Sequence, residues 1–341
     1  MDSLSQIVLG ASVAEASIGG KVGNKAMFWG AVAGTIPDLD VFSKYVVDTV
    51  GSLWFHRTVT HSLIFCIVFA PILGWIIHKI HKNGSATWKD WCLMSFWCLV
   101  THPLLDCFTT WGTMFFWPFS EFKIAWKTVF VVDPMYTIPF LVLVVWAMFY
   151  NRTHYKRSKL NNWGLGISSF YLFLTIFSKQ AADANFNKGF ESAGITPVQY
   201  DTRPTPLNNI LWTTNAEIEN EYLIGYYSHF DTSHNSDFQF FNKNHHLLET
   251  YSENKKLQTL IELTQGYYTV EQIDSVTYHI SDLRFGQVYS HTNKEGFFVF
   301  TYVIDTSTFK DTGELTITQK PNEFKGAGTF ISELWNRILG Q

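Results

Sequence analysis

The sequence predicts a mostly α-helical membrane domain of about six apolar helices, followed by a smaller soluble α+β domain. Three observations support this fold class. The 341 residues are 47% hydrophobic and 17% aromatic but only 16% charged, which is unusual for a soluble protein. Residues 1–180 hold 11 of the 13 tryptophans but only 23 of the 54 charged residues. Six apolar stretches also lie in this first half, so the two halves differ in kind.

The predicted helices follow the apolar stretches in order. A helix needs about 20 residues to cross a bilayer. The first two stretches are shorter, so we expect these helices to be tilted or re-entrant. A segment with several glycines and lysines, 19–25, separates them. The six stretches are 4–19, 26–37, 62–80, 91–105, 135–150 and 163–178.

The basic residues predict an orientation. If the N-terminus lies outside, the inner connections 20–25, 79–90 and 151–162 carry nine Lys and Arg residues. The outer segments 38–61 and 106–134 then carry four. The positive-inside rule therefore predicts a multi-pass protein of the inner (cytoplasmic) membrane with its C-terminal domain on the outer side.

The second half reads as a separate domain. Residues 181–206 include a Pro-rich passage that predicts a linker, and residues 207–341 predict a soluble α+β domain. Its strands are expected at 222–228, 276–280 and 297–304, and a helix near 254–265. The net charge of -4 provides no basic field for phosphate backbones, so no nucleic-acid partner is expected. The four cysteines match no zinc or redox spacing.

Two acidic residues follow the second predicted helix, in Pro37-Asp38-Leu39-Asp40. Alternate residues of an extended turn can place one carboxylate on a metal ion and turn its neighbour toward a second metal or a ligand histidine. We predict Asp40 as a metal ligand and Asp38 as a candidate general base. The alternative is a Pro-Asp helix stop with two solvated acids.

Two histidines flank an arginine in the segment 56–62. Histidines five positions apart do not share one helical face, but His56 and His61 can converge if the first lies in a loop and the second begins a helix. Both are predicted metal ligands. Arg57 is predicted to stabilise a phosphate or carboxylate through its two parallel N–H donors. The alternatives are capping or interfacial histidines and an arginine that reaches lipid headgroups.

A third cluster lies in the fourth predicted helix, in Thr101-His102-Pro103-Leu104-Leu105-Asp106. His102 and Asp106 are four positions apart, so they lie one above the other on a helix face. An imidazole and a carboxylate at this spacing can bind the same ion. We predict both as metal ligands, and the alternative is a structural hydrogen bond between them.

The predicted topology brings these clusters together. Starting from the loop charges alone, all of their acidic and imidazole groups fall at the outer ends of helices. Asp133, in Val131-Val132-Asp133-Pro134, falls there too and is a second candidate general base. This mixture of oxygen and nitrogen ligands favours a zinc site, with manganese as the alternative divalent metal.

Seven motifs in this order and spacing carry a resemblance to a known family. They are Met1-Asp2-Ser3-Leu4-Ser5-Gln6-Ile7-Val8-Leu9-Gly10, Gly34-Thr35-Ile36-Pro37-Asp38-Leu39-Asp40, His56-Arg57 with Thr60-His61-Ser62, Thr101-His102-Pro103 with Asp106, Gly112-Thr113, Pro118-Phe119-Ser120 and Val132-Asp133-Pro134. Over about residues 1–180 the chain resembles the YdjM-type family of membrane-bound metal-dependent hydrolases, also called LexA-binding inner-membrane-associated hydrolases. The stretch 208–231 resembles the C-terminal part of longer members.

The resemblance implies a distant similarity to the zinc-dependent phospholipase C and single-strand nuclease superfamily, helical enzymes that cleave phosphoesters with clustered zinc ions. It implies that His102 and Asp106 match that superfamily's His-x-x-x-Asp ligand pair. It also implies that Asp40 and His61 match its preceding ligands. Many family members have histidine where this chain has Gln6, and glutamine is a poor zinc ligand. The resemblance therefore leaves a further metal near the N-terminus open.

The predicted function is a membrane-bound, metal-dependent hydrolase that cleaves a phosphoester of a lipid-linked or amphiphilic substrate at the outer face. A metal pair would lower the pKa of a bound water, and Arg57 would stabilise charge in the transition state. The expected partners are the lipid bilayer and such a substrate, and a protein partner is left open. The alternatives are a membrane transporter and a metal-stabilised binding or assembly protein without hydrolase activity.

Overall fold

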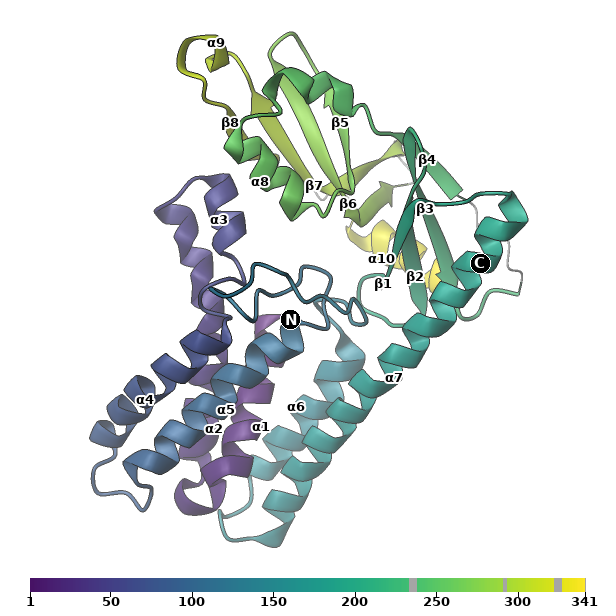
Figure 1. The fold of residues 1–341 in the computed structure, drawn as a ribbon. Helices are drawn as coiled ribbons and strands as arrows, with labels where there is room; N and C mark the ends of the chain where they lie inside the picture. The colour runs from purple at the N-terminus through teal and green to yellow at the C-terminus, as the bar shows by residue number, and fades with distance from the viewer. Residues whose placement is uncertain (233–237, 291–292, 322–326, 341) are drawn as a thin grey trace. The chain divides into compact units, whose positions relative to one another are not determined.

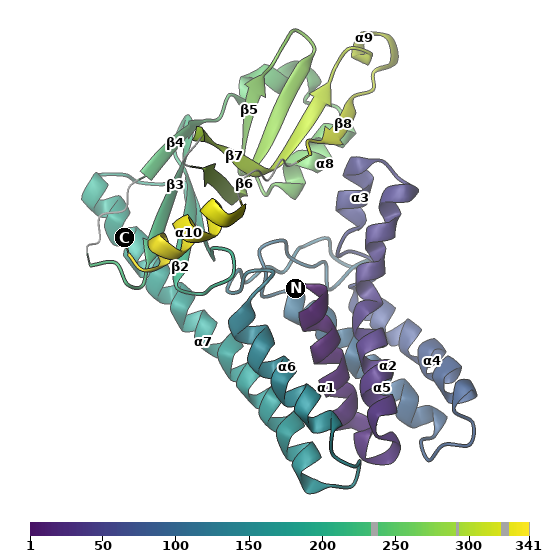
Figure 2. The same ribbon diagram turned by 180° about the vertical axis from the view of Figure 1, so that it is seen from behind.

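A computed structural model describes residues 1–232, 238–290, 293–321 and 327–340 (Figures 1 and 2). The chain divides into two compact units. The first, which we call the helical unit, comprises Met1–Ser43, Phe55–Ser178 and Pro206–Asn209. The second, the β unit, comprises Lys44–Trp54, Lys179–Thr205 and Ile210–Gln341. Helix α7 begins in the helical unit and ends in the β unit.

The helical unit is a bundle of roughly parallel and antiparallel helices, drawn from purple to teal in Figure 1. Helix α1 packs against α2, α5 and α6, and α4 packs against α5. The elements are α1 (Ser3–Val22), α2 (Asn24–Thr35), the 3₁₀ helix η1 (Pro37–Tyr45), α3 (Thr49–Phe55), α4 (Leu63–Ile80), α5 (Trp88–Asp106), α6 (Pro134–Met148) and α7 (Tyr155–Ala193). Of these, η1 and α3 contribute residues to both units.

The prediction of about six membrane-crossing helices is wrong. Within the described ranges, α4 alone is long and apolar enough to cross a membrane. The predicted stretches 4–19, 91–105 and 163–178 lie in helices, and 26–37 and 135–150 begin in helices but run past their ends. However, α2 has 12 residues and α6 has 15, fewer than the roughly 20 that a bilayer requires. Polar and small residues dilute α1 and α5, and α7 continues into a charged segment.

Small residues allow α1 and α2 to approach closely. A Cβ atom added to Gly10 would lie 2.2 Å from the carbonyl oxygen of Gly30, and one added to Gly34 would lie 2.6 Å from that of Gln6. Spacing of small residues by four positions on both helices is the pattern that lets helix backbones touch. The contact brings the start of α1 beside the end of α2, where the polar clusters of the sequence lie.

Side-chain caps set where several helices begin. The Asp2 carboxylate accepts hydrogen bonds from the backbone N–H groups of Leu4 and Ser5 at the start of α1. Ser62 caps α4 in the same way, and Thr87 forms a capping box at the start of α5. These caps satisfy backbone donors that have no partner within the helix. Because Ser62 is the N-cap of α4, His61 is held immediately before the first turn of that helix.

A buried ion pair fixes α7 to the far end of α1. Arg157 donates from Nε and Nη2 to the two carboxylate oxygens of Glu15, each at 2.6 Å, and both side chains are buried. Asn161, one turn further along α7, exchanges hydrogen bonds with Ser12. Gly19 leaves room for this pair, since a Cβ there would lie 2.2 Å from the Glu15 carboxyl carbon.

The β unit contains two four-stranded antiparallel sheets, each with its strands in sequence order. The first has β1 (Gln199–Pro204), β2 (Leu211–Glu217), β3 (Glu221–Ser228) and β4 (Phe238–Asn242). The second has β5 (Tyr268–Gln272), β6 (Thr277–Ser290), β7 (Asn293–Asp305) and β8 (Thr316–Gln319). The 3₁₀ helix η2 (His245–Tyr251) and helices α8 (Lys255–Leu263), α9 (Phe309–Thr312) and α10 (Ala327–Ile338) complete the unit.

Alternation along the strands explains how the first sheet is covered. Trp212 and Leu223 on one face pack with Phe186 and Phe190 of α7. Tyr222 and Ile224 on the other face pack with Tyr267 and Leu283, which belong to or adjoin the second sheet. The predicted strands at 222–228, 276–280 and 297–304 lie in or overlap β3, β6 and β7. The predicted linker 181–206 contains the end of α7 and all of β1.

Candidate metal centre

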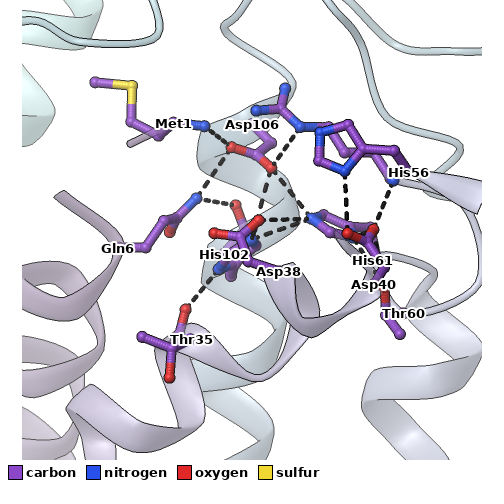
Figure 3. Close-up of polar contacts among 12 residues, drawn as sticks. Met1, Gln6, Thr35, Asp38, Asp40, His56, Thr60, His61, His102 and Asp106 are labelled. Atoms are coloured by element: carbon purple, nitrogen blue, oxygen red, sulfur yellow. Dashed lines mark hydrogen bonds and ion pairs between the residues drawn. The ribbon is translucent and has the colours of Figure 1, made fainter. Parts of the chain in front are cut away.

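Four side chains converge at one end of the helical unit (Figure 3). One ligand atom of each lies within 4.8 Å of the corresponding atom of every other. Asp38 comes from η1, His61 from the segment just before α4, and His102 and Asp106 from the last turns of α5. We call these four residues the metal group. Three of them are fully buried, and the side chain of Asp38 is 23% exposed.

The distances within the metal group fit a tetrahedral ion. His61 Nε2 and His102 Nε2 lie 3.1 Å apart. Asp106 Oδ2 lies 3.3 Å and 3.6 Å from these two nitrogens, and Asp38 Oδ1 lies 3.6 Å and 3.4 Å from them. Ligands about 2.1 Å from a tetrahedral zinc ion lie about 3.4 Å from one another. The group therefore has a suitable number of ligands, of suitable type, at a suitable spacing.

The second ring nitrogen of each histidine meets an acceptor. His102 Nδ1 lies 2.6 Å from the carbonyl oxygen of Gly34, which can only accept, so this nitrogen carries the proton. His61 Nδ1 lies 3.3 Å from Asp40 Oδ2 and 3.1 Å from Thr60 Oγ1. Metal-binding histidines are usually oriented in this way, by donating their other N–H to a carboxylate or a carbonyl. When both rings are neutral, both Nε2 atoms present lone pairs to the centre of the group.

Hydrogen bonds hold Asp106 at one of its two carboxylate oxygens. Oδ1 accepts hydrogen bonds from Gln6 Nε2, at 3.0 Å, and from the α-amino group of Met1. Oδ2 lies 3.1 Å from Arg57 Nε, and within the described part of the chain no hydrogen bond to it is formed. A buried carboxylate oxygen without a hydrogen bond is costly. A cation bound by the metal group would satisfy it.

Arg57 lies next to Asp106 of the metal group and is only 4% exposed. Its Nη1 donates to Thr109 Oγ1 at 2.6 Å, and its backbone N–H donates to Asp40 Oδ2 at 2.8 Å. The backbone φ of Arg57 is 62°, in the left-handed region that non-glycine residues rarely adopt. The sequence predicted that this guanidinium meets a substrate. The structure turns it toward Asp106.

Asp40 and His56, both predicted as metal ligands, form a layer outside the metal group. Asp40 Oδ1 lies 3.0 Å from His56 Nδ1, while Asp40 Oδ2 faces His61. The His56 ring lies 5.7 Å from the Trp111 ring, and its side chain is 35% exposed. Asp40 therefore orients a histidine of the group and joins it to a half-exposed imidazole.

The two predicted general bases lie in different surroundings. Asp38 belongs to the metal group. Asp133 caps α6 through hydrogen bonds from the backbone N–H groups of Met135 and Tyr136. Its Oδ2 accepts a hydrogen bond from the Tyr171 hydroxyl at 2.6 Å. Both oxygens of Asp133 are thus engaged in fixing the start of α6.

The charges of the group shift its protonation. Burial alone would raise the pKa of Asp38, but the nearby imidazoles of His102 and His61 outweigh it and hold the pKa well below its usual range. The pKa of Asp40 is lowered in the same way by His56 and His61. For His61, burial would lower the pKa, yet the nearby carboxylates of Asp106, Asp38 and Asp40 raise it to about 10. Without a bound ion, the group therefore retains a proton.

Several contributors were not predicted from the sequence as parts of this centre, among them the Gln6 amide, the Gly34 carbonyl and Thr109. Gln6 is 1% exposed although it lies in an apolar stretch, and an amide in such a position is the signal that could have pointed to it. The Gly34 carbonyl and Thr109 leave no such signal, because backbone groups and common small polar residues occur throughout the chain.

Comparisons with known proteins identify the family to which the chain belongs. The profile of the family described as YdjM inner membrane protein matches residues 1–182. This chain belongs to the YdjM inner membrane protein family. It is also similar to the inner membrane protein YbcI of Escherichia coli (strain K12), at 30% identity over 123 residues that cover 34% of this chain and 69% of YbcI. No solved structure matches the chain significantly.

The YdjM match contains every residue of the metal group. It places the protein at the inner membrane, since both descriptions name that location. Neither description names an activity or a metal. The function of this YdjM family member is therefore inferred from the residues of its metal group.

Proposed function

We propose that the protein is a metal-dependent hydrolase of phosphoesters, acting on an amphiphilic or lipid-linked substrate at the membrane. One observation carries the proposal. In the metal group, two imidazole nitrogens and two carboxylate oxygens face one another with the other sides of both rings already engaged. Four acceptors at this spacing repel each other unless a cation or shared protons lie between them.

The residues that surround the group would each have a defined task. His61, His102, Asp106 and Asp38 would hold the ion, which is zinc or alternatively manganese. Bound there, the ion would lower the pKa of a water molecule and polarise a phosphoryl oxygen. Arg57 and Gln6 would keep Asp106 in place. Asp38 is the partly exposed member of the metal group, so substrate would approach beside it, and its carboxylate would accept a proton from the attacking water.

The site would face the outer side of the inner membrane. The connections at the bundle end opposite the metal group are 20–25, 79–90 and 151–162, which hold the nine basic residues counted above (Figure 1). The positive-inside rule favours the cytoplasm for that end. The metal group, next to the other end of α4, would then lie at the outer surface.

A second candidate is a metal-stabilised binding or assembly protein. The observation that favours it is the ligand count, because structural zinc sites have four protein ligands whereas catalytic sites keep a position open. The exposure of Asp38 favours the enzyme. A transporter is disfavoured, since the ligands gather at one end of the bundle instead of at several depths.

The test begins with metal analysis of protein purified in detergent without chelators. We expect about one zinc or manganese ion per chain, in line with a four-ligand site. The same sample is then assayed against soluble and lipid phosphoesters, with His102→Ala as the inactive reference. Stoichiometric metal without turnover of any phosphoester would support the assembly protein instead. Absence of bound metal after supplementation with zinc and manganese would refute both.

A further inference from the structure

Two segments at the end of the helical unit that holds the metal group carry exposed apolar side chains. In the segment between α5 and α6, Phe116 is 51% exposed, Phe119 84% and Phe122 72%. In η1, Leu39 is 53% exposed and Phe42 57%. We call these five residues the aromatic rim. Leu39 lies between Asp38 and Asp40 in the chain, so the rim adjoins the partly exposed member of the metal group.

The backbone of the loop is ordered, so this exposure does not come from an unstructured segment. Phe119 N–H donates to the carbonyl oxygen of Phe116 at 2.9 Å, and Phe122 N–H donates to Ser120 Oγ at 3.2 Å. Thr113 and Ile124 form an antiparallel bridge across the loop. Holding three phenylalanines outward in water is unfavourable, and a fixed patch of this kind marks an interaction surface.

Backbone hydrogen bonds attach the loop to the segment that carries the metal ligands. Met114 N–H donates to the Arg57 carbonyl oxygen at 3.0 Å, and Leu63 N–H donates to that of Phe115 at 2.9 Å. Leu63 is the first residue of α4, the helix long and apolar enough to cross a membrane. The loop that carries the rim is therefore attached at the start of that helix, next to His61.

This position fits one partner, the hydrocarbon of a lipid leaflet. Ile67 and Val68 of α4 are themselves 52% and 59% exposed, so an outward apolar surface continues from α4 toward the loop. Between Phe115 and Trp126 the charged residues are Glu121 and Lys123, which cancel. Aromatic side chains at the end of a spanning helix lie where hydrocarbon meets headgroups. Membership of an inner membrane family supplies the membrane.

We propose that the aromatic rim inserts into the lipid leaflet beside the metal group and receives the hydrocarbon chain of an amphiphilic phosphoester. The phosphoester would then reach Asp38 laterally from the lipid, and not from the aqueous phase. The substrate part of this inference rests on the proposed function. The insertion of the rim does not, because it follows from exposure and position alone.

Insertion can be measured by spin labels in proteoliposomes of phosphatidylethanolamine and phosphatidylglycerol. Cys66, Cys98 and Cys107 are buried, so a Cys92→Ala background leaves few reactive thiols. Labels are placed by Phe119→Cys and Phe122→Cys. Matched references are Ile72→Cys on the 48% exposed outer face of α4, for lipid, and Asn83→Cys in the exposed turn after α4, for water. Collision with oxygen and with a water-soluble nickel chelate is compared at each site.

We expect both rim labels to behave like the label at position 72, accessible to oxygen and shielded from nickel. Nickel accessibility equal to that at position 83 would overturn the proposal, because the rim would then face water. Shielding from both reagents would overturn it too, because protein and not lipid would cover the rim. These results need no enzyme activity, so they are independent of the proposed function.

The substrate part is tested by turnover. The double variant Phe119→Ser/Phe122→Ser should lose about tenfold or more in kcat/KM for a long-chain lipid phosphate, with unchanged turnover of a short-chain soluble phosphoester and unchanged metal content. Phe240→Ser, a 50% exposed phenylalanine of β4, is the control and should alter neither. Equal losses for both substrates would show that the rim does not select the chain. If no wild-type turnover exists, the labels still decide insertion.

Discussion

His61 Nε2 and His102 Nε2 face each other at 3.1 Å, within hydrogen-bonding distance. His102 Nδ1 is committed to the Gly34 carbonyl, and His61 Nδ1 faces Asp40. Two neutral imidazoles in this arrangement place lone pair against lone pair. In that state the two nitrogens repel each other, and a cation, either a metal ion or an added proton, would relieve the repulsion.

Removing either imidazole should remove the metal. We expect His61→Ala and His102→Ala to lose stoichiometric zinc or manganese, because three ligands bind an ion much more weakly than four. His56→Ala is the matched control and should keep most of its metal, since His56 contacts Asp40 outside the group. Elemental analysis of detergent-purified protein measures this. Equal metal loss in all three variants would place His56 among the ligands.

Metal affinity should rise with pH. An ion requires His61 to be neutral, whereas without an ion its pKa is raised to about 10. Binding between pH 7 and 9 should therefore release about one proton, and affinity should increase by up to tenfold per pH unit. Calorimetry in buffers of different ionisation enthalpy measures the released proton. A pH-independent affinity would show that His61 is already neutral.

The same shift predicts a stability trend for chelator-treated protein. Because the folded pKa of His61 is raised above the usual value of about 6.5, its stabilising contribution is complete below pH 6.5. It declines as the pH rises toward 10, where the folded protein also loses the proton. The melting temperature should fall over this range, and less so in His61→Gln. A melting temperature that stays constant or rises would contradict the assignment.

Arg57 should act through Asp106. We expect Arg57→Lys to weaken metal binding about 10- to 100-fold, the usual effect of losing a group that orients a ligand. Lysine keeps the charge but cannot contact Asp106 and Thr109 from one planar group. Thr109→Val, which removes only the acceptor of Nη1, should have a smaller effect. Competition with a metallochromic chelator measures both. Normal metal affinity with lost turnover in Arg57→Lys would instead put Arg57 on the substrate.

Gly30→Ala should separate α1 from α2. The added Cβ would lie 2.2 Å from the Gly10 carbonyl oxygen and 2.4 Å from the Ala14 Cβ, so the helices must move apart. Gln6 and Gly34 would shift with them, and metal content should fall together with the melting temperature. Gly20→Ala is the control, because nothing lies within 4 Å of its added Cβ. Equal melting temperatures for the two variants would argue against this close packing.

The ion pair of Glu15 and Arg157 should stabilise α7 against α1. Arg157→Met leaves a buried carboxylate without its partner and should cost about 3–5 kcal/mol of unfolding free energy. The double variant Glu15→Gln/Arg157→Met should cost less than the sum of the two single variants, because the first change removes most of the penalty of the second. Denaturation in mixed micelles measures the cycle. Additive costs would mean that the two side chains do not interact.

The sequence was most informative where local spacing alone decides geometry. His102 and Asp106 are four residues apart on α5, and their atoms do come together. For the two aspartates of η1, the sequence predicted Asp40 as the metal ligand and Asp38 as the general base. In a 3₁₀ helix, residues two apart point in different directions, so only one can face the centre. The structure selects Asp38 and turns Asp40 toward His61, and a choice of this kind depends on tertiary packing.

The number of spanning helices could not be read from apolar stretches because composition does not give helix length. Helix α2 is followed by Ile36 and Pro37, and α6 starts at Pro134, so both are short. The residues that bind Asp106 could not be predicted from the sequence either. Gln6 lies on another helix, and its contact with Asp106 follows from glycine-mediated packing that no local pattern reports.

In both sheets of the β unit, each strand pairs only with strands adjacent to it in the chain. Each hairpin can therefore close over a short loop, and no strand must wait for a distant partner to be synthesised. During translation, each sheet could assemble strand by strand as the chain emerges. Truncations at the ends of β4 and β8 should consequently leave ordered intermediates, whereas cuts within a sheet should expose an unpaired edge that is prone to aggregate.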